Sequence, residues 1–330
     1  MEYSLLLYAT MSKRRINKQQ SSRIEKNQRA YQETKDVGLG GLADGLVITR
    51  FSRQVEIEDE QGKRIRCSIR PHLDTLVAGD RIIWQTEGLS QGVVVSLYPR
   101  ASMLARPTTA GLKKPVAANI TQLVIVIAAK PVLSWPLLDS YLIMAETLKL
   151  HAIILLNKTD IPCETLKEDL LTNYQPLGYP VLFINNADPQ ADLELKHLLN
   201  NQVSVFVGQS GVGKSTIISR LLPHETNIAT QEISEISELG RHTTSNSYYY
   251  HIPSGGALID SPGVREFHLW EMDAMSIAKG YLEFQPYTIL CKYRNCLHIN
   301  TPECGLIEAL NKDLISARRY DNYIKLCTKS

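Results

Sequence analysis

In residues 119–222, unbroken apolar runs alternate with amphipathic stretches, and this pattern limits the possible folds more than any other feature. The runs ITQLVIVIAA, HAIILL, PVLFIN and QVSVFVG are typical of strands that are buried on both faces. The stretches between and after them, such as PLLDSYLIMAETLKL and KSTIISRLL, have helical periodicity. Strands and helices that alternate along a chain predict a parallel α/β sheet.

The sequence GQSGVGKS follows the last of these apolar runs and opens a predicted helix. It fits G-x-x-x-x-G-K-S, whose glycines let backbone N–H groups close around phosphate oxygens at a helix N-terminus. Lys214 is expected to reach the β- and γ-phosphates, and the Ser215 hydroxyl to bind Mg²⁺. The alternative is a tight strand–helix turn without a ligand. The predicted phosphate loop comprises Gly208, Gln209, Ser210, Gly211, Val212, Gly213, Lys214, Ser215 and Thr216.

Two further motifs complete a nucleotide site. GALIDSPGV places Asp260 and Gly263 at the end of an apolar run, where Asp260 suits the Mg²⁺ site and the Gly263 amide suits the γ-phosphate. The apolar run HAIILL is followed directly by the tetrapeptide Asn157-Lys158-Thr159-Asp160. An Asp carboxylate there can accept hydrogen bonds from guanine, and adenine offers no such donor pair, so the tetrapeptide predicts guanine selectivity.

The base-reading tetrapeptide precedes the phosphate loop, which is the reverse of the usual order in GTP-binding domains. Ligands of open α/β sheets bind at the carboxyl ends of the strands, so the position of a loop along the chain does not matter. Joining the old ends and opening a new break preserves such a site. We therefore interpret residues 119–273 as a circularly permuted GTPase domain.

Residues 37–100 have a different pattern. Short alternating runs, among them GLVITRFSRQVEIED and QGVVVSLYP, are separated by turns and predict a five-stranded β-barrel, for which an OB-fold is the best match. Its basic residues predict an RNA-facing surface, although a barrel with a charged exterior is the simpler alternative. They are Arg50, Arg53, Lys63, Arg64, Arg66 and Arg70. Residues 101–118 are predicted to be a linker, in which Pro107 and Pro115 break regular structure.

The formal net charge is only +2, but residues 11–35 alone carry eight basic and two acidic side chains. Residues 1–36 are therefore predicted to be a disordered basic arm, either solvated or in contact with nucleic-acid phosphates. The start MEYSLLLYAT lacks a basic n-region and a small-residue cleavage site, so a cytoplasmic protein is expected. No apolar run is long enough to span a membrane.

The segment ILCKYRNCLHINTPECGL gathers three of the six cysteines and one histidine. Three thiolates and one imidazole complete a tetrahedral shell, so Cys291, Cys296, His298 and Cys304 predict one structural Zn²⁺ per chain. Unrelated reduced thiols are the alternative. Residues 274–330, which include mostly helical flanks, are interpreted as a zinc-binding helical module.

Together, the motifs NKTD, GQSGVGKST, GRHTTS, DSPGVREF and the Cys/His cluster occur in the order found in the RsgA (YjeQ) family. The chain resembles this family of circularly permuted GTPases of small-ribosomal-subunit maturation from about residue 37 to its end. The resemblance implies a multi-domain α/β protein with an OB-fold, a permuted P-loop GTPase domain and a zinc domain. Asn185 and Asn186 stand where the family often has Ser-Ser or Ser-Ala, and they are expected to line the base.

The resemblance also implies ligands and partners. GTP and GDP with Mg²⁺, the small ribosomal subunit and its 16S rRNA are expected, and we expect a monomer. His242 is favoured as the water-positioning group, against a mobile surface histidine, and either Thr243 or Thr244 is expected to close on Mg²⁺. Val264 replaces the glutamine that orients water in many GTPases, so slow intrinsic hydrolysis is expected.

Three other functions remain possible from the sequence alone. A pure binding module would use the nucleotide only to order the fold, but the chain keeps Lys214, Ser215 and Asp260. A P-loop kinase or ATPase is the second alternative, but NKTD predicts guanine selectivity, which an enzyme that uses ATP does not need. A GTP-dependent RNA-binding switch with a non-ribosomal partner is the third alternative.

Overall fold

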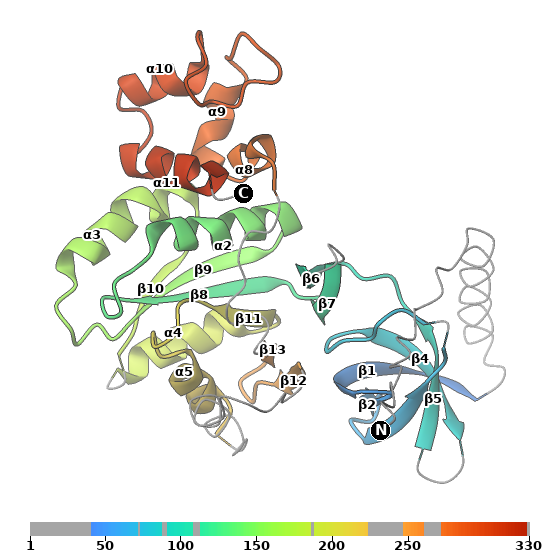
Figure 1. The fold of residues 1–330 in the computed structure, drawn as a ribbon. Helices are drawn as coiled ribbons and strands as arrows, with labels where there is room; N and C mark the ends of the chain where they lie inside the picture. The colour runs from blue at the N-terminus through green and yellow to red at the C-terminus, as the bar shows by residue number, and fades with distance from the viewer. Residues whose placement is uncertain are drawn as a thin grey trace, which may run out of the picture.

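The computed structural model describes residues 41–71, 73–87, 91–107, 113–185, 188–223, 247–260 and 272–328. Figure 1 shows a β-barrel near the N-terminus, a central sheet with helices on both faces, and a helical module that ends the chain. The basic arm predicted for residues 1–36 lies outside the described residues.

Five strands form the barrel. They are β1 (Leu42–Phe51), β2 (Gln54–Asp59), β3 (Arg64–Ile69), β4 (Arg81–Glu87) and β5 (Gln91–Leu97). β1 pairs with both β2 and β4, and β3 pairs in parallel with β5, so the sheet closes in the order β1-β2-β3-β5-β4. Alternate residues such as Val47, Ile57 and Trp84 fill the interior. The barrel predicted from the alternating runs is present.

Within the predicted linker, two strands pair as an antiparallel ribbon, β6 (Met103–Pro107) and β7 (Lys113–Ala118). The two prolines that were expected to break structure both lie in these strands. Proline is tolerated in edge strands, and both strands of a two-stranded ribbon are edge strands. Ala117 forms a bridge to Ala78 of the barrel, so the hairpin packs against the domain that it follows.

The central sheet has the spatial order β10-β9-β8-β11-β13-β12. Its strands are β8 (Gln122–Ala128), β9 (His151–Asn157), β10 (Val181–Phe183), β11 (Val203–Val207), β12 (Tyr248–His251) and β13 (Ala257–Asp260). All neighbours are parallel except β12, which runs antiparallel to β13. Four predicted apolar runs therefore became strands of one parallel sheet.

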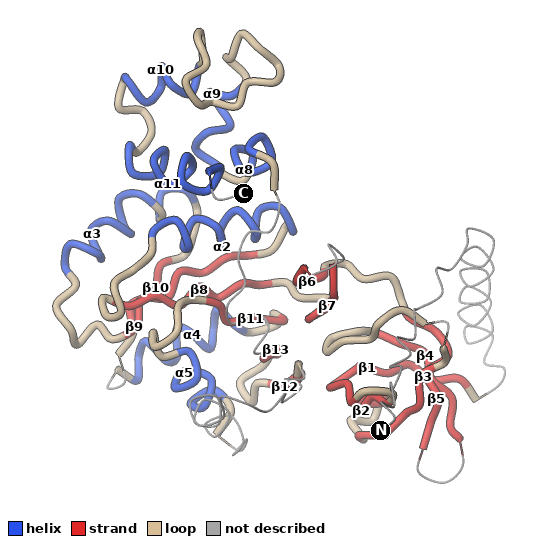
Figure 2. Tube along the Cα trace, in the orientation of Figure 1, coloured by secondary structure: helices blue, strands red, loops and turns tan. Residues whose placement is uncertain are grey.

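Helices cover both faces of this sheet (Figure 2). They are α2 (Trp135–Leu148), α3 (Glu164–Asn173), the 3-10 turn η1 (Gln175–Leu177), α4 (Pro189–Leu199) and α5 (Lys214–Leu221). On β8, Leu123, Ile125 and Ile127 pack into the core beneath α2 and α3. The alternate residues Val124 and Val126 pack into the core beneath α4 and α5. Because both faces of β8 are buried, its sequence does not alternate between polar and apolar residues.

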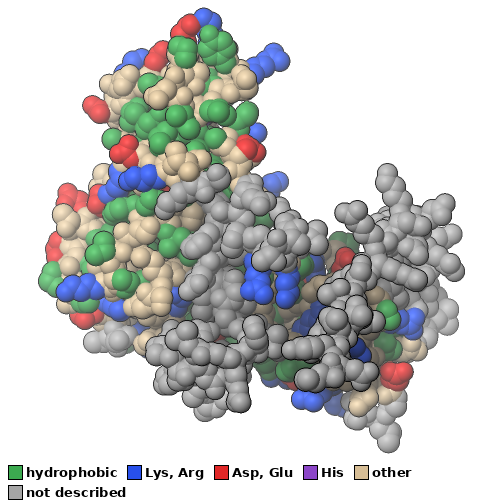
Figure 3. All heavy atoms as spheres, in the orientation of Figure 1, with side chains coloured by type: hydrophobic (Ala, Val, Ile, Leu, Met, Phe, Trp, Pro, Cys, Tyr) green, Lys and Arg blue, Asp and Glu red, His purple; other side chains and the backbone are tan. Residues whose placement is uncertain are grey.

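The C-terminal module contains α8 (Ala274–Lys279), η2 (Leu282–Phe284), α9 (Gln285–Thr288), α10 (Gly305–Asn311) and α11 (Ala317–Thr328). It packs on the outer side of α2 (Figure 1). Its own core contains Tyr281, Phe284 and Tyr323. Figure 3 shows hydrophobic side chains exposed over this module, and Ile289 and Leu290 are among its exposed residues.

No helix in the described part of the chain has the length and apolar character that crossing a bilayer requires.

Candidate nucleotide and metal sites

The carboxyl ends of β9, β11 and β13 lie at one edge of the sheet because these strands are parallel. The chain runs from β8 outward to β9 and β10, then returns to the other side of β8 with β11. The strand order therefore reverses between β8 and β11, and such switch points are where open α/β sheets bind ligands. The predicted phosphate loop follows β11, directly at this point.

The phosphate loop requires glycine at its start. Gly208 has a φ of +140°, a conformation that L-residues rarely adopt, and an added Cβ would lie 2.1 Å from the Val126 carbonyl oxygen of β8. Gly213 is the residue before α5 and has a φ of +98°. A Cβ there would lie 2.3 Å from Nδ2 of Asn157. Both glycines therefore permit close approach to neighbouring strands or loops.

The Lys214 side chain is buried inside the loop. Its ammonium group donates hydrogen bonds of 2.8 Å and 2.7 Å to the carbonyl oxygens of Gly208 and Gln209. The adjacent Ser215 hydroxyl is buried and has no hydrogen-bond partner within the described residues. Asp260 ends β13 and is also buried. A buried hydroxyl without a partner is costly unless a ligand satisfies it, so this oxygen suits a hard cation such as Mg²⁺.

The tetrapeptide after β9 braces the phosphate loop from the side. Asn157 Nδ2 donates to the Val212 carbonyl oxygen at 2.9 Å, and Lys158 Nζ donates to that of Gly211 at 2.6 Å. The backbone N–H and the hydroxyl of Thr159 both donate to the Ile184 carbonyl oxygen, which ties this loop to the loop after β10.

Side-chain exposure separates the bracing residues from Asp160, the residue that is predicted to contact the base. Asn157 is buried, whereas Asp160 is exposed at the end of the same tetrapeptide. Asn185 follows Ile184 and is half-buried beside this loop. In the phosphate loop, Ser210 and Thr216 are exposed. The exposed carboxylate of Asp160 is therefore accessible to a base.

The segment 130–134, between β8 and α2, touches both loops, and no sequence motif pointed to it. Gln209 accepts a hydrogen bond from the Ser134 backbone N–H at 3.0 Å, and its Nε2 donates to the Val132 carbonyl oxygen at 3.1 Å. Lys158 Nζ also donates to the Lys130 carbonyl oxygen. All three contacts use backbone atoms of the segment, so residue types could not have predicted them.

Several predicted site residues lie outside the described part of the chain. They are Asn186, His242, Thr243, Thr244 and Gly263, together with Val264.

The predicted zinc ligands meet in the C-terminal module. The ligand atoms of Cys291, Cys296, His298 and Cys304 all lie within 4.8 Å of one another. His298 Nδ1 is 3.5 Å from the Sγ atoms of both Cys291 and Cys304. Four residues within a stretch of 14 thus form a cluster with the donor set and size of a tetrahedral metal site.

Burial changes the pKa values of two members of the cluster in opposite senses for metal binding. It lowers the pKa of His298, which favours the neutral imidazole that can bind a metal. It also raises the pKa of the Cys304 thiol to about 12. A cation in the cluster would reverse this effect by stabilising the thiolates. Tyr320 of α11 donates a 2.8 Å hydrogen bond to the His298 carbonyl oxygen and so anchors the ligand loop to the module.

The chain resembles known proteins over nearly its whole length. The RsgA GTPase family model matches residues 97–270. A small ribosomal subunit biogenesis GTPase RsgA of Haemophilus influenzae strain PittGG is 41% identical over 332 residues, covering 96% of this chain and 95% of the relative. A protein named small ribosomal subunit biogenesis GTPase RsgA 1, from Vibrio vulnificus strain YJ016, is 44% identical, covering 95% and 91%.

Solved structures agree with the fold. The crystal structure of YjeQ from Thermotoga maritima superposes with a TM-score of 0.72 at 27% identity, covering 87% of this chain and 98% of that one. YloQ, described as a circularly permuted GTPase, superposes with a TM-score of 0.68 at 26% identity, covering 87% and 94%. The predicted fold class, including the permuted order of the GTPase strands, is confirmed.

We expect Gly208→Ala to lower the free energy of unfolding by about 2–5 kcal/mol, from backbone strain and the clash with Val126. Gly178→Ala is the matched control, because Gly178 has a φ of +93° but nothing within 4 Å of an added Cβ. The control should lose only about 1 kcal/mol. Urea titrations followed by circular dichroism measure both changes. Equal losses would mean that Val126 does not restrict the loop.

Proposed function

The chain belongs to the RsgA GTPase family, and from that premise we propose that it hydrolyses GTP at the sheet edge and acts in biogenesis of the small ribosomal subunit. One observation carries the assignment of the site. The loops after β9 and β11 are braced against each other, and the first turn of the helix that follows carries the buried Ser215 hydroxyl, which has no hydrogen-bond partner among the described residues. This arrangement supports a triphosphate with its cation at the phosphate loop and a base beside Asp160.

In this proposal the phosphate loop binds through its backbone N–H groups and the α5 N-terminus. The Lys214 ammonium group exchanges its hydrogen bonds to the carbonyl oxygens of Gly208 and Gln209 for contacts with the β- and γ-phosphates. Ser215 and Asp260 hold Mg²⁺, directly or through water, and Thr244 is a further candidate ligand. When bound, this ion neutralises charge that develops on the phosphates during hydrolysis. His242 is proposed to position the attacking water.

Binding to the small subunit is proposed to involve the barrel and its rRNA-facing charge. The Arg66 guanidinium carbon lies 5.7 Å from the ring centroid of Phe51, which is 39% exposed. Exposed aromatic and basic side chains together can stack on bases and neutralise phosphates. We propose that 16S rRNA is the partner, that the protein acts as a cytoplasmic monomer, and that the GTP-bound form binds the subunit more tightly.

The Cys/His cluster is proposed to hold one structural Zn²⁺ per chain. All four ligand positions are filled by protein groups, and three of the four residues are buried. Such a closed shell supports a role in folding the module rather than in hydrolysis.

The first test measures GTP turnover with and without purified small ribosomal subunits. We expect slow hydrolysis by the chain alone and clear stimulation by the subunits, with tighter binding to a non-hydrolysable GTP analogue than to GDP. Lys214→Ala should lower stimulated turnover by about 100-fold or more, because it removes charge stabilisation at the transferred phosphate.

The outcome separates the alternatives. Hydrolysis that persists in Lys214→Ala would place the active site elsewhere. If the subunits do not stimulate hydrolysis, and if they bind the GTP-analogue form and the GDP form equally, the ribosomal role is rejected. A non-ribosomal RNA partner would then be favoured.

Guanine selectivity is predicted to depend on Asp160. Asp160→Asn should weaken GTP binding by about 10- to 100-fold, because a charged hydrogen-bond acceptor for the base is lost. The same change should improve binding of xanthosine nucleotides, whose base offers the complementary acceptor. Competition assays with GTP, ATP and xanthosine triphosphate measure the effect. Equal affinity of the unaltered chain for GTP and ATP would contradict base reading by this loop.

Metal analysis of the purified chain should find one zinc ion per molecule. Cys304→Ser should abolish stoichiometric zinc and lower the thermal stability of the C-terminal module, because one of four ligands is removed. Cys327→Ser is the control, since Cys327 lies in the same module but outside the cluster. Folded protein without zinc, or equal zinc loss in both variants, would argue against this site.

A further inference from the structure

Two consecutive arginines of α11 interleave with aromatic rings of the GTPase domain. Arg318 lies over the ring of Trp135, with its guanidinium carbon 3.8 Å from the ring centroid. Trp135 stacks on Tyr174 at 5.9 Å with an angle of 12° between the planes. Arg319 lies over Tyr174 at 4.8 Å and over Tyr281 at 4.6 Å. The result is one column, Arg318–Trp135–Tyr174–Arg319–Tyr281, that passes from the C-terminal module into the sheet domain and back.

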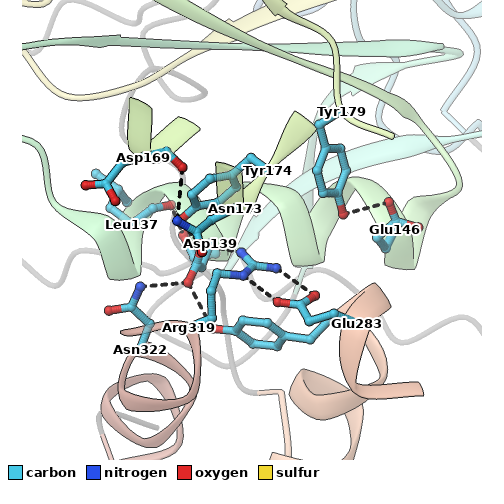
Figure 4. Close-up of polar contacts among 12 residues, drawn as sticks. Leu137, Asp139, Glu146, Asp169, Asn173, Tyr174, Tyr179, Glu283, Arg319 and Asn322 are labelled. Atoms are coloured by element: carbon cyan, nitrogen blue, oxygen red, sulfur yellow. Dashed lines mark hydrogen bonds and ion pairs between the residues drawn. The ribbon is translucent and has the colours of Figure 1, made fainter. Parts of the chain in front are cut away.

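Arg319 fixes the position of this column. Its Nη1 donates to Asp139 at 2.5 Å, and its Nε and Nη2 donate to the two carboxylate oxygens of Glu283 at 2.6 Å and 3.0 Å. Figure 4 shows Arg319 reaching from α11 toward both carboxylates. Burial alone would lower the pKa of Arg319, but Asp139 and Glu283 hold it well above its ordinary value. Asn322 and Tyr174 also donate to Asp139, so the buried charges are compensated.

Arg318 is the outer and adjustable member of the column. Its side chain is 28% exposed, and Nη1 makes an ion pair of 2.7 Å with Asp169 of α3. Its Nε and Nη2 are buried without a hydrogen-bond partner within the described residues, so the stack on the Trp135 ring is the principal contact of that side of the guanidinium. A cation this close to a tryptophan face is strongly attracted to it.

Trp135 connects this contact to the phosphate loop. It is the first residue of α2, and the preceding residue, Ser134, uses its backbone N–H to hold Gln209. The Nε2 atom of the Gln209 carboxamide donates a hydrogen bond to the Val132 carbonyl oxygen. Within the described part of the chain, the Ser134 side chain makes no capping bond to α2, so its contact with Gln209 is made by the backbone alone. Only one peptide unit therefore separates the stacked indole from the residue that clamps the loop.

We propose that Arg318 is a positioning residue for the phosphate loop: its stack on Trp135 sets the start of α2, and the segment 130–134 transmits that position to Gln209. This inference rests on the proposed function, because it assigns Arg318 to the binding of the same nucleotide. By linkage, a nucleotide that prefers one position of the loop must bias the docking of α11 by the same factor. The C-terminal module would then sense occupancy of the nucleotide site through its own helix.

The test compares three full-length variants by their affinities for GDP and for a non-hydrolysable GTP analogue. Arg318→Met keeps the apolar stem but removes the cation from Trp135, and nucleotide binding should weaken about two- to tenfold. Asp169→Asn is the matched control, because it removes the ion pair of Arg318 and leaves the stack. We expect its affinities to equal those of the unaltered chain. Arg319 and Asp139 are unsuitable, since breaking a buried pair threatens folding.

A double-mutant cycle with Gln209→Ala supplies the readout that a purely structural role would not move. If Arg318 acts through Gln209, adding Arg318→Met to Gln209→Ala should cause little further loss of affinity. Independent, additive losses would overturn the proposal. So would unchanged affinity in Arg318→Met, or an equal loss in Asp169→Asn. If the unaltered chain bound neither nucleotide, the proposed function itself would fail, and the positioning role with it.

Discussion

Burial of the central strands on both faces is the constraint on which the rest of the structure depends. β8 sends alternate side chains into two separate cores, one beneath α2 and α3 and one beneath α4 and α5. Helices connect β8, β9 and β11 as crossovers, so these strands run parallel and their carboxyl ends meet at one edge. The order in which the chain visits those strands has no effect on the edge itself. A permuted chain therefore builds the same site as an unpermuted one.

The candidate nucleotide site is braced largely by contacts to backbone carbonyl oxygens. Asn157, Lys158 and Lys214 all donate to oxygens of the phosphate loop, and Gln209 connects that loop to the segment 130–134. Such bracing fixes the loop before any ligand arrives, which reduces the entropy lost on binding. Ser215 is the exception, because its buried hydroxyl lacks a partner in the described structure. Rigid surroundings around one unsatisfied group are what a preformed cation site requires.

The C-terminal module is joined to the GTPase domain by charge as well as by apolar packing. Asp139 is buried in α2, and it accepts hydrogen bonds from Arg319 and Asn322 of α11. A buried carboxylate without such donors would be strongly unfavourable, so the two domains depend on each other at this point. The Cys/His cluster belongs to the same module, and Tyr320 of α11 donates a hydrogen bond to the His298 carbonyl oxygen within it. One helix thus contacts both the candidate metal-binding loop and the domain that holds the candidate nucleotide loops.

The sequence by itself determined the strands of the sheet, because strand formation there depends on local apolar runs. Motifs at the ends of these runs predicted the site residues Lys214 and Asp160, and the cysteine spacing predicted the Cys/His cluster. Tertiary structure alone decided the contacts between distant segments. Pro115 lies in a strand of a two-stranded hairpin, and Arg319 is buried because Asp139, 180 positions away, faces it. The clamp on Gln209 uses backbone atoms, which every residue shares. Periodicity and motifs carry no signal for such pairings, since only folding brings the partners within hydrogen-bond distance.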